Sequence, residues 1–104
     1  MAEIIWSLTA GSDLQKIEEF IAKDSVLHAV AFVDRLIESA EKLKVSPNIG
    51  RIVPEFSRQD LREVLFRGYR VVYLSSPETV TVLRVVHGAR DLAELARREP
   101  WDFA

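Results

Sequence analysis

Cysteine is absent from the 104 residues of this chain, which excludes disulfide bonds and thiolate metal sites. A chain without cysteine also fits a reducing cytoplasm. Glycine is scarce and dispersed, so the sequence has no glycine-rich phosphate loop. No apolar run is long enough to cross a membrane, and the N-terminus, with an acid at Glu3, lacks the basic segment that begins a signal peptide. We expect one cytoplasmic domain over residues 1–104, because this length supports a single core.

Charge is small in sum but unevenly distributed. The formal net charge is −2, all four lysines lie in the first half, and nine of the ten arginines follow residue 50. Residues 1–50 carry five cationic side chains against eight acidic ones, or −3, whereas residues 51–91 carry seven against five, or +2. Arginine pairs carboxylates and phosphates through a planar fork. The pattern therefore indicates either a recognition surface in the second half or drift in composition.

The N-terminal segment predicts a strand followed by a helix. An apolar run within residues 4–8 indicates the strand. Ser12, followed three residues later by Gln15, has the spacing of a capping box. We therefore expect the first helix over residues 13–23, with its apolar side chains at helical spacing.

A second helix is expected to pack antiparallel to the first. It begins near residue 26, after Asp24 or Ser25 as its cap, and ends near residue 44, where proline and glycine follow. The two helices form a hairpin over about 13–45. The apolar face expected for the second helix consists of Val26, Val30, Val33, Ile37 and Ala40.

The second half predicts a β-meander over about 61–87. Arg67-Gly68 has the form of a two-residue hairpin turn, because glycine readily takes a positive φ. The last run is apolar on both faces, as in a strand flanked on both sides. The strands are expected at residues 61–66, 69–74 and 79–86.

A short helix should follow the meander. Asp91 with Glu94 three residues later predicts a cap for a helix over residues 92–98, and the C-terminal helix and tail span about 91–104. The whole pattern predicts an α+β fold of order β-α-α-β-β-β with a short C-terminal helix. The N-terminal strand and the two-helix hairpin would pack on a mainly antiparallel sheet.

Six segments stand in a fixed order along nearly the whole chain. They are Trp6 at the end of the first strand, Ala10 with Asp13-Leu14, Gly50-Arg51, Leu61-Arg62-Glu63, Tyr69-Arg70-Val71-Val72-Tyr73, and VLRVVHGARDL at residues 82–92. This ordered set resembles the RelE/ParE superfamily of bacterial toxins from type II toxin–antitoxin pairs. The resemblance implies the fold of that superfamily and a toxin acting in the bacterial cytoplasm.

Two branches of the superfamily imply different activities. ParE-like toxins poison DNA gyrase, whereas RelE-like toxins cleave mRNA in the ribosomal A site with basic residues and often a tyrosine or histidine near the C-terminus. Cleavage needs a base, an acid and a cation on the phosphate, yet no lysine follows Lys44 and no tyrosine follows Tyr73. A net charge of −2 also suits ribosomal RNA poorly. We expect a ParE-like gyrase poison. A ribosome-dependent mRNA interferase is the alternative, and a non-toxic relic that still binds its antitoxin is the second.

The chemistry of single residues names no catalytic set. If the chain were a nuclease, Arg62, Arg84 and His87 would be its candidates. As interface residues, for antitoxin or target, we expect Arg51, Arg62, Arg70, Arg84, His87, Arg90, Trp101 and Phe103.

Each strand arginine also has a structural interpretation. Pairing across the Arg67-Gly68 turn would place Arg62 opposite Tyr73 for stacking, and Arg70 diagonal to Glu63 for an ion pair. Arg84 would be buried with a carboxylate, Glu55 being one candidate, or exposed for contact.

The remaining candidate residues also have both a functional and a structural interpretation. Arg51 lies in a loop, where it could act in function or anchor the loop through a helix end or Glu55. Arg90 could pair with the adjacent acid. His87 would be a base, a partner contact or a strand-end hydrogen-bonding residue, and His28 is expected to be structural. Trp101 and Phe103 would either enter a partner groove or cap the core.

The resemblance also implies partners. A ParD-like antitoxin would bind with an extended or helical segment over the apolar groove beside the helical hairpin, and its carboxylates would neutralise the sheet arginines. A heterotetramer or larger complex is expected, with DNA gyrase as the target. We expect no cofactor, no metal, no membrane association and no direct sequence-specific binding of nucleic acid.

Overall fold

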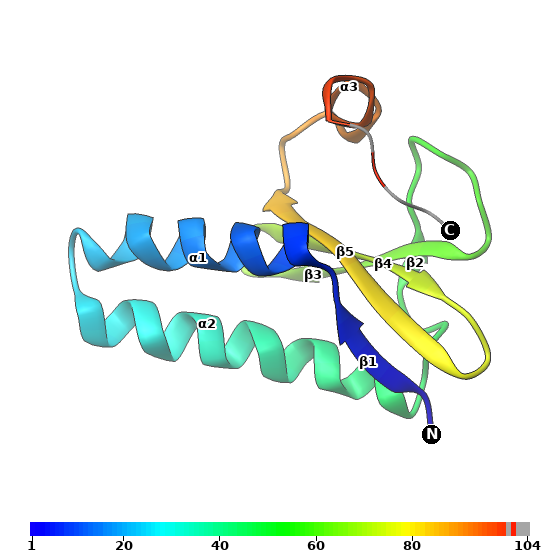
Figure 1. Ribbon diagram of the computed structural model, residues 1–104, viewed down its shortest axis with the longest axis horizontal. Coiled ribbons are helices and arrows are strands. Elements are labelled where there is room, and N and C mark those ends of the chain that lie inside the picture. The colour runs from blue at the N-terminus through cyan, green and yellow to red at the C-terminus, as the bar shows by residue number, and fades with distance from the viewer. Residues whose placement is uncertain (100, 102–104) are drawn as a thin grey trace.

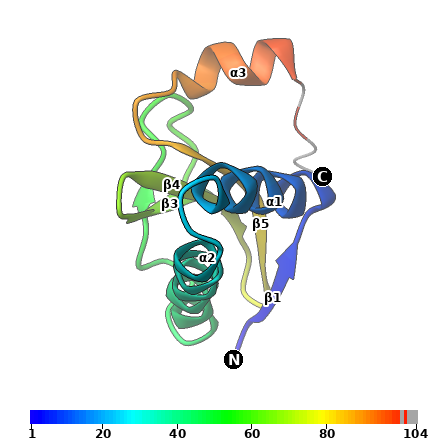
Figure 2. The same cartoon turned by 90° about the vertical axis from the view of Figure 1, so that its left-hand side faces the viewer.

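The computed structural model describes residues 1–99 and 101, and it has the predicted α+β architecture (Figure 1). Two helices lie across one face of a twisted sheet, and a short third helix lies apart from them (Figure 2). The elements in chain order are β1 (Glu3–Trp6), α1 (Leu8–Ala22), α2 (Val26–Glu41), the 3₁₀ turn η1 (Lys42–Lys44), β2 (Arg51–Ile52), β3 (Leu61–Phe66), β4 (Tyr69–Ser75), β5 (Thr79–His87) and α3 (Leu92–Arg98). Within the described residues no helix has the length and apolar character needed to span a bilayer.

The sheet has the order β1-β5-β4-β3-β2. β1 runs parallel to β5, and the other pairs are antiparallel. The predicted register around the Arg67-Gly68 turn is confirmed, since Phe66 pairs with Tyr69 and Arg62 with Tyr73. Arg67 and Gly68 both take positive φ angles, 46° and 88°, as a two-residue turn of the primed type requires. β5 is flanked by β1 and β4, as its run of apolar residues predicts.

Helix α1 begins five residues before the predicted start at residue 13. Its cap is Ser7, whose hydroxyl accepts a hydrogen bond from the Ala10 amide at 3.0 Å and donates one to the Leu83 carbonyl. Gly11 lies inside the helix with open space around it, so it does not end the preceding segment. The prediction of a cap at Ser12 was wrong, because a short strand leads directly into the helix through Ser7.

The apolar face predicted for α2 was also wrong by a rotation of the helix. The buried residues of the helix are Ala29, Phe32, Leu36 and Ala40. Of the predicted set only Ala40 belongs to them, while Val26 and Val30 are 66% and 45% exposed. Periodicity alone did not decide between two adjacent apolar stripes on one helix. The stripe containing Val26 and Val30 is left facing outward.

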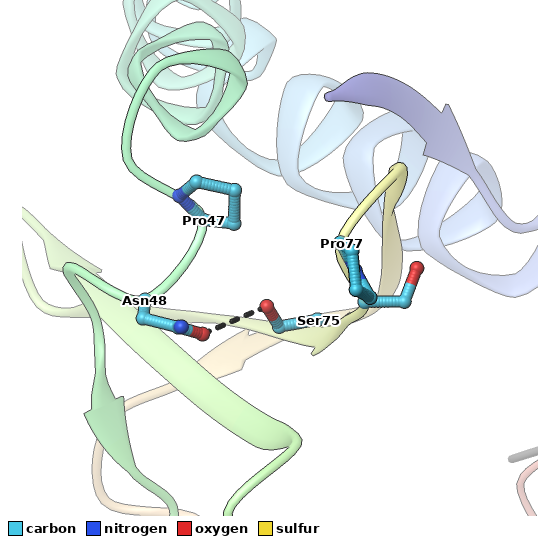
Figure 3. A pocket seen from close by; sticks show the side chains of 5 residues that line it. Pro47, Asn48, Ser75 and Pro77 are labelled. Carbon is cyan, nitrogen blue, oxygen red and sulfur yellow. Dashed lines mark hydrogen bonds between the residues drawn. The ribbon is translucent and has the colours of Figure 1, made fainter. Parts of the chain in front are cut away.

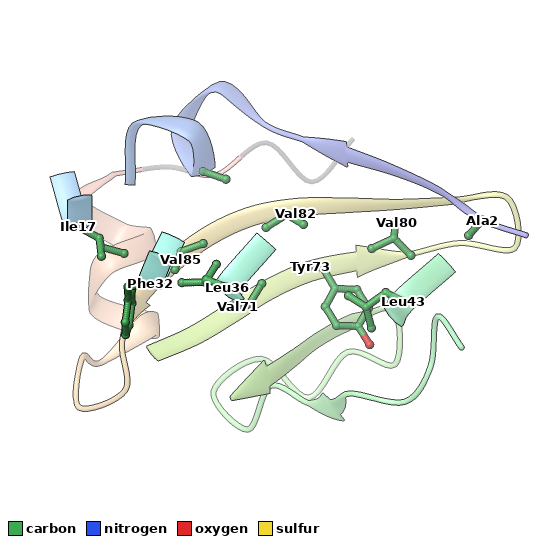
Figure 4. Packing of buried hydrophobic residues seen from close by; sticks show 11 residues of the cluster. Ala2, Ile17, Phe32, Leu36, Leu43, Val71, Tyr73, Val80, Val82 and Val85 are labelled. Carbon is green, nitrogen blue, oxygen red and sulfur yellow. The ribbon is translucent and has the colours of Figure 1, made fainter. Parts of the chain in front are cut away.

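Both faces of the sheet are covered. The helical hairpin covers one face with a core centred on Leu36, Tyr73 and Val82 (Figure 4). The other face is packed by the loop before β3 and by α3, through Val53 and Leu92 among others. In Figure 1 the turn between α1 and α2 extends beyond the end of every strand, so the hairpin overhangs the sheet.

Candidate functional site

Arg70 is the centre of an ion network on the sheet face opposite the helical hairpin. Its Nε lies 2.6 Å from Glu63 Oε1, and its two terminal nitrogens lie 2.8 Å from the carboxylate oxygens of Glu55. Arg51 Nε binds the second oxygen of Glu63 at 2.6 Å. Arg70 also donates to the carbonyl of Arg90. The predicted pair between Arg70 and Glu63 is therefore confirmed, and Arg70 is buried rather than offered to solvent.

This network ties the loop and the last helix to the sheet. The carboxylate of Glu55 also accepts from the Leu92 amide at the start of α3. The hydrogen bonds from Arg70 hold the pKa of Glu55 at about 2, below its ordinary value of 4.5. The same bonds raise the pKa of Arg70. The carboxylate of Glu55 is therefore ionised in the folded protein near neutral pH.

Arg84 is buried beside Asp13, not beside Glu55. Two nitrogens of Arg84 bind the two oxygens of Asp13 at 2.9 and 3.1 Å, and Asp13 also accepts from the Val85 amide. The bidentate bonds with Asp13 raise the pKa of Arg84. A further nitrogen of Arg84 lies 3.6 Å from Glu99, and the ring of Trp101 lies 5.8 Å from the guanidinium. The structural interpretation of Arg84 holds, with a different partner.

Arg62 faces Tyr73 in the register, but its guanidinium binds backbone carbonyls. It donates to Gln59, Asn48 and Gly50, which fixes the loop before β3. The hydroxyl of Tyr73 donates to the Pro47 carbonyl at 2.7 Å and accepts from the Gly50 amide at 3.0 Å. Burial raises the pKa of Tyr73. A Cβ at residue 50 would lie 2.6 Å from the Tyr73 hydroxyl, so this position requires glycine.

His87 and Arg90 lie in the exposed connection between β5 and α3. The Nδ1 of His87 accepts from the Ala89 amide at 3.3 Å, and its ring lies 5.8 Å from the ring of Tyr69. Within the described residues the guanidinium of Arg90 makes no ion pair, because the neighbouring Asp91 caps α3 through the amides of Ala93 and Glu94. The proposed pair of Arg90 with Asp91 is therefore not formed.

Trp101 is partly buried against Phe56, at 5.6 Å between ring centres, and packs on the second core. This contact favours the structural interpretation of that residue. Phe103 lies outside the described residues.

The three residues considered for a nuclease are not gathered at one place. Arg62 pairs with Tyr73 in β4, whereas His87 pairs with Tyr69. Four residues along a strand separate these positions by about 13 Å at roughly 3.3 Å per residue. Arg84 is meanwhile held by Asp13. No assembled base, acid and phosphate-binding cation is present among the three.

One hollow near the β4–β5 turn is lined by Pro47, Asn48, Ser75, Ser76 and Pro77, with Asn48 accepting a hydrogen bond from Ser75 (Figure 3). It has no titratable lining residue and therefore no general acid or base. In the part of the chain that the structure describes, no group of three or more His, Cys, Asp or Glu side chains could hold a metal ion.

The sequence predicted an apolar groove beside the helical hairpin but did not identify the exposed apolar side chains at its turn. Phe20 and Leu27, on either side of the turn between α1 and α2, are 67% and 85% exposed. Leu65 on β3 is 62% exposed. Large exposed apolar groups that cluster on one element are typical of a binding surface. The predicted apolar stripe of α2 carried this signal, but it was assigned to the core.

The structure is that of a small α+β protein with a helical hairpin on a largely antiparallel sheet and exposed apolar side chains at the hairpin turn. The family model of the ParE toxin of type II toxin–antitoxin systems, parDE, matches residues 4–92. The chain belongs to this family, within the RelE/ParE superfamily.

Two known proteins illustrate the relationship. Toxin RelE2 of Caulobacter vibrioides is 32% identical over 91 residues, which cover 86% of this chain and 99% of the relative. A solved structure described as the chromosomal ParDE TA system from P. aeruginosa matches with a TM-score of 0.70 at 20% identity, over 84% of this chain and 96% of the other. Because the sequence identity of this second match is only 20%, it shows that the two proteins share a fold.

Proposed function

We propose that this toxin arrests growth by binding DNA gyrase in the bacterial cytoplasm, and that a ParD-like antitoxin neutralises it by direct binding. The observation that carries the proposal is the contrast between the two kinds of surface. Arg70 and Arg84 are buried in ion pairs, and the half-buried Arg62 binds backbone carbonyls of its own chain. The helical hairpin exposes several large apolar side chains, among them Phe20, Val26 and Leu27. Such a surface suits a protein partner more than a phosphate backbone.

The antitoxin is expected to cover the outward apolar side chains of the hairpin. This placement follows from Val26, Val30 and Leu27, which lie exposed on α2. The sequence predicted that carboxylates of the antitoxin would neutralise the sheet arginines. In Arg70 and Arg84, internal acids already do so: Glu55 and Glu63 bind Arg70, and Asp13 binds Arg84. A heterotetramer or larger complex remains our expectation for the pair.

Controlled expression in a bacterial host tests the target. We expect growth arrest, accumulation of double-strand DNA breaks and, with purified protein, inhibition of gyrase supercoiling. Co-expression of the antitoxin should restore growth. Arrest without breaks and with normal supercoiling would refute the gyrase proposal, and antitoxin binding without arrest would identify a non-toxic relic.

The runner-up function is an mRNA interferase, and the similarity to Toxin RelE2 is the observation that favours it. Mapping of mRNA 5′ ends after induction separates the two. Codon-phased cleavage that disappears in Arg84→Lys, which keeps a cation beside Asp13, would support the interferase. Unchanged mRNA ends during arrest would support the gyrase poison.

A further inference from the structure

A hollow of about 420 Å³ lies beneath the turn that joins α1 and α2. Its lining residues are Phe20, Ile21, Lys23, Asp24 and His28. The hairpin overhangs the sheet at this end (Figure 1). Pockets that enclose small ligands have volumes of about 300–1,000 Å³. The hollow therefore has room for a large side chain of another molecule.

A row of aromatic rings leads from the hollow to the end of the sheet. His28 lies 6.5 Å from Phe32, Phe32 lies 5.8 Å from Tyr69, and Tyr69 lies 5.8 Å from His87, all measured between ring centres. Phe66 packs edge-on against Phe32 at 5.4 Å. These rings come from α2, β3, β4 and β5. Phe32 is buried in the core, so the row is packed inside the molecule and only its ends, His28 and His87, are exposed.

The charged side chains near the hollow and the aromatic row are mostly positive. The Lys23 ammonium lies 5.8 Å from the ring centre of Phe20, and the Arg67 guanidinium lies 5.4 Å from that of Phe66. Neither cation makes an ion pair within residues 1–99 and 101, and both are exposed. Asp24 is the single acid among the residues that line the hollow. The rim thus complements a negatively charged partner, in a chain whose net charge is −2.

We propose that this hollow, with its aromatic row, receives the neutralising segment of the antitoxin, which inserts a large apolar side chain beneath the turn and sets carboxylates against Lys23 and Arg67. The inference rests on the proposed antitoxin partner. Apolar anchors in a pocket with a charged rim are the usual arrangement of energetic hot spots in protein interfaces. The site differs from Arg70 and Arg84 of the sheet, which internal carboxylates already neutralise.

The test measures the affinity of the full-length toxin for the full-length antitoxin encoded beside it, by calorimetric titration. Phe20→Asp removes the apolar wall and repels a carboxylate, and the expected affinity loss is about thirtyfold or more. Lys23→Glu should weaken binding by about tenfold and reduce its dependence on salt. All changed side chains are solvent-exposed, and circular dichroism checks that the variants remain folded.

Two matched controls lie away from the hollow. Val45→Asp changes an apolar residue that is 75% exposed beyond the opposite end of α2, and Arg97→Glu reverses an exposed cation on α3. Both should alter the affinity by no more than about twofold. An equal loss in Phe20→Asp and Val45→Asp, or no loss in either, would overturn the proposal.

Growth assays separate this inference from the proposed function. If Phe20→Asp abolishes growth arrest but binds antitoxin normally, the hollow faces the target and the proposal is wrong. If the wild-type chain binds antitoxin without arresting growth, the gyrase proposal fails while the affinity test stands. If the wild-type chain does not bind the antitoxin, the partner and the site are refuted together.

Discussion

At the scale of single residues, the pair of Asp13 and Arg84 shows how a charge is kept inside the molecule. Removing one partner of a buried ion pair leaves the other without compensation, at a cost of about 3–5 kcal/mol. We expect Asp13→Ala to lower the free energy of unfolding by about this amount, since Asp13 also accepts from the Val85 amide. Urea denaturation of the purified variant measures the change.

The double variant Asp13→Leu with Arg84→Met provides the control. Replacing both charges by apolar groups of similar volume is often nearly neutral. We expect the double variant to be more stable than Asp13→Ala, with a remaining loss from the unsatisfied Val85 amide. Equal stability of Asp13→Ala and wild type would show that the pair contributes nothing.

Glu55 makes the stability of the folded protein depend on pH in the acidic range. Its pKa is about 2 in the folded protein and 4.5 ordinarily, so the folded state favours the ionised form. A depressed pKa gives stability that is fully present above pH 4.5 and is lost as the pH falls towards 2. We expect Glu55→Gln to be less stable than wild type at pH 7 and to lose less stability between pH 5 and 2. Urea midpoints across this range give the measurement, with the exposed Glu78→Gln as the matched control.

At the scale of elements, the start of α1 offers two serines with different roles. Ser7 caps the helix and also binds β5 through the Leu83 carbonyl, whereas Ser12 is exposed within the helix. Loss of a helix cap costs roughly 0.5–2 kcal/mol. We expect Ser7→Ala to destabilise the protein by about 1 kcal/mol, and Ser12→Ala to leave its stability unchanged or slightly raised, because alanine favours helix. Thermal unfolding of the two variants decides between the caps.

Most strands could be predicted from the sequence because their signals are local. The turn at Arg67-Gly68 fixes the register of β3 against β4, and with it the pairing of Arg70 with Glu63. The start of α1 could not be predicted in this way, since two serines offered a cap and only packing against Leu83 distinguishes them. The buried stripe of α2 was likewise decided by the sheet beneath it.

The candidate site was less predictable than the fold. The partner of Arg84 is 71 residues away in the sequence, and no spacing rule connects such distant positions. The hollow at the hairpin turn depends on where the helical hairpin is placed along the sheet, because its turn extends beyond the ends of the strands. The abundance of arginine in the second half can be read from the sequence. Which arginines are buried and paired with acids depends on tertiary contacts.

At the scale of the whole molecule, a protein that acts only by binding does not need an acid–base residue such as His87 for toxicity. His87 is exposed, and within the described residues its imidazole accepts one hydrogen bond, from the Ala89 amide of the same turn. If the toxin acts by binding a protein, His87→Ala should arrest growth as strongly as wild type, within about twofold. A base in RNA cleavage contributes about 10²–10⁴ in rate, so loss of arrest together with loss of phased mRNA cleavage would contradict binding alone.

The parallel pairing of the first and last strands links the two ends of the chain. Glu3 lies beside Thr79, so the N-terminal strand has no neighbour until 76 more residues have been added. A ribosome making this protein must therefore release nearly all of it before the sheet can close, and partial translation products would lack the supporting edge for α1. The fold of this toxin is therefore completed only near the end of its synthesis.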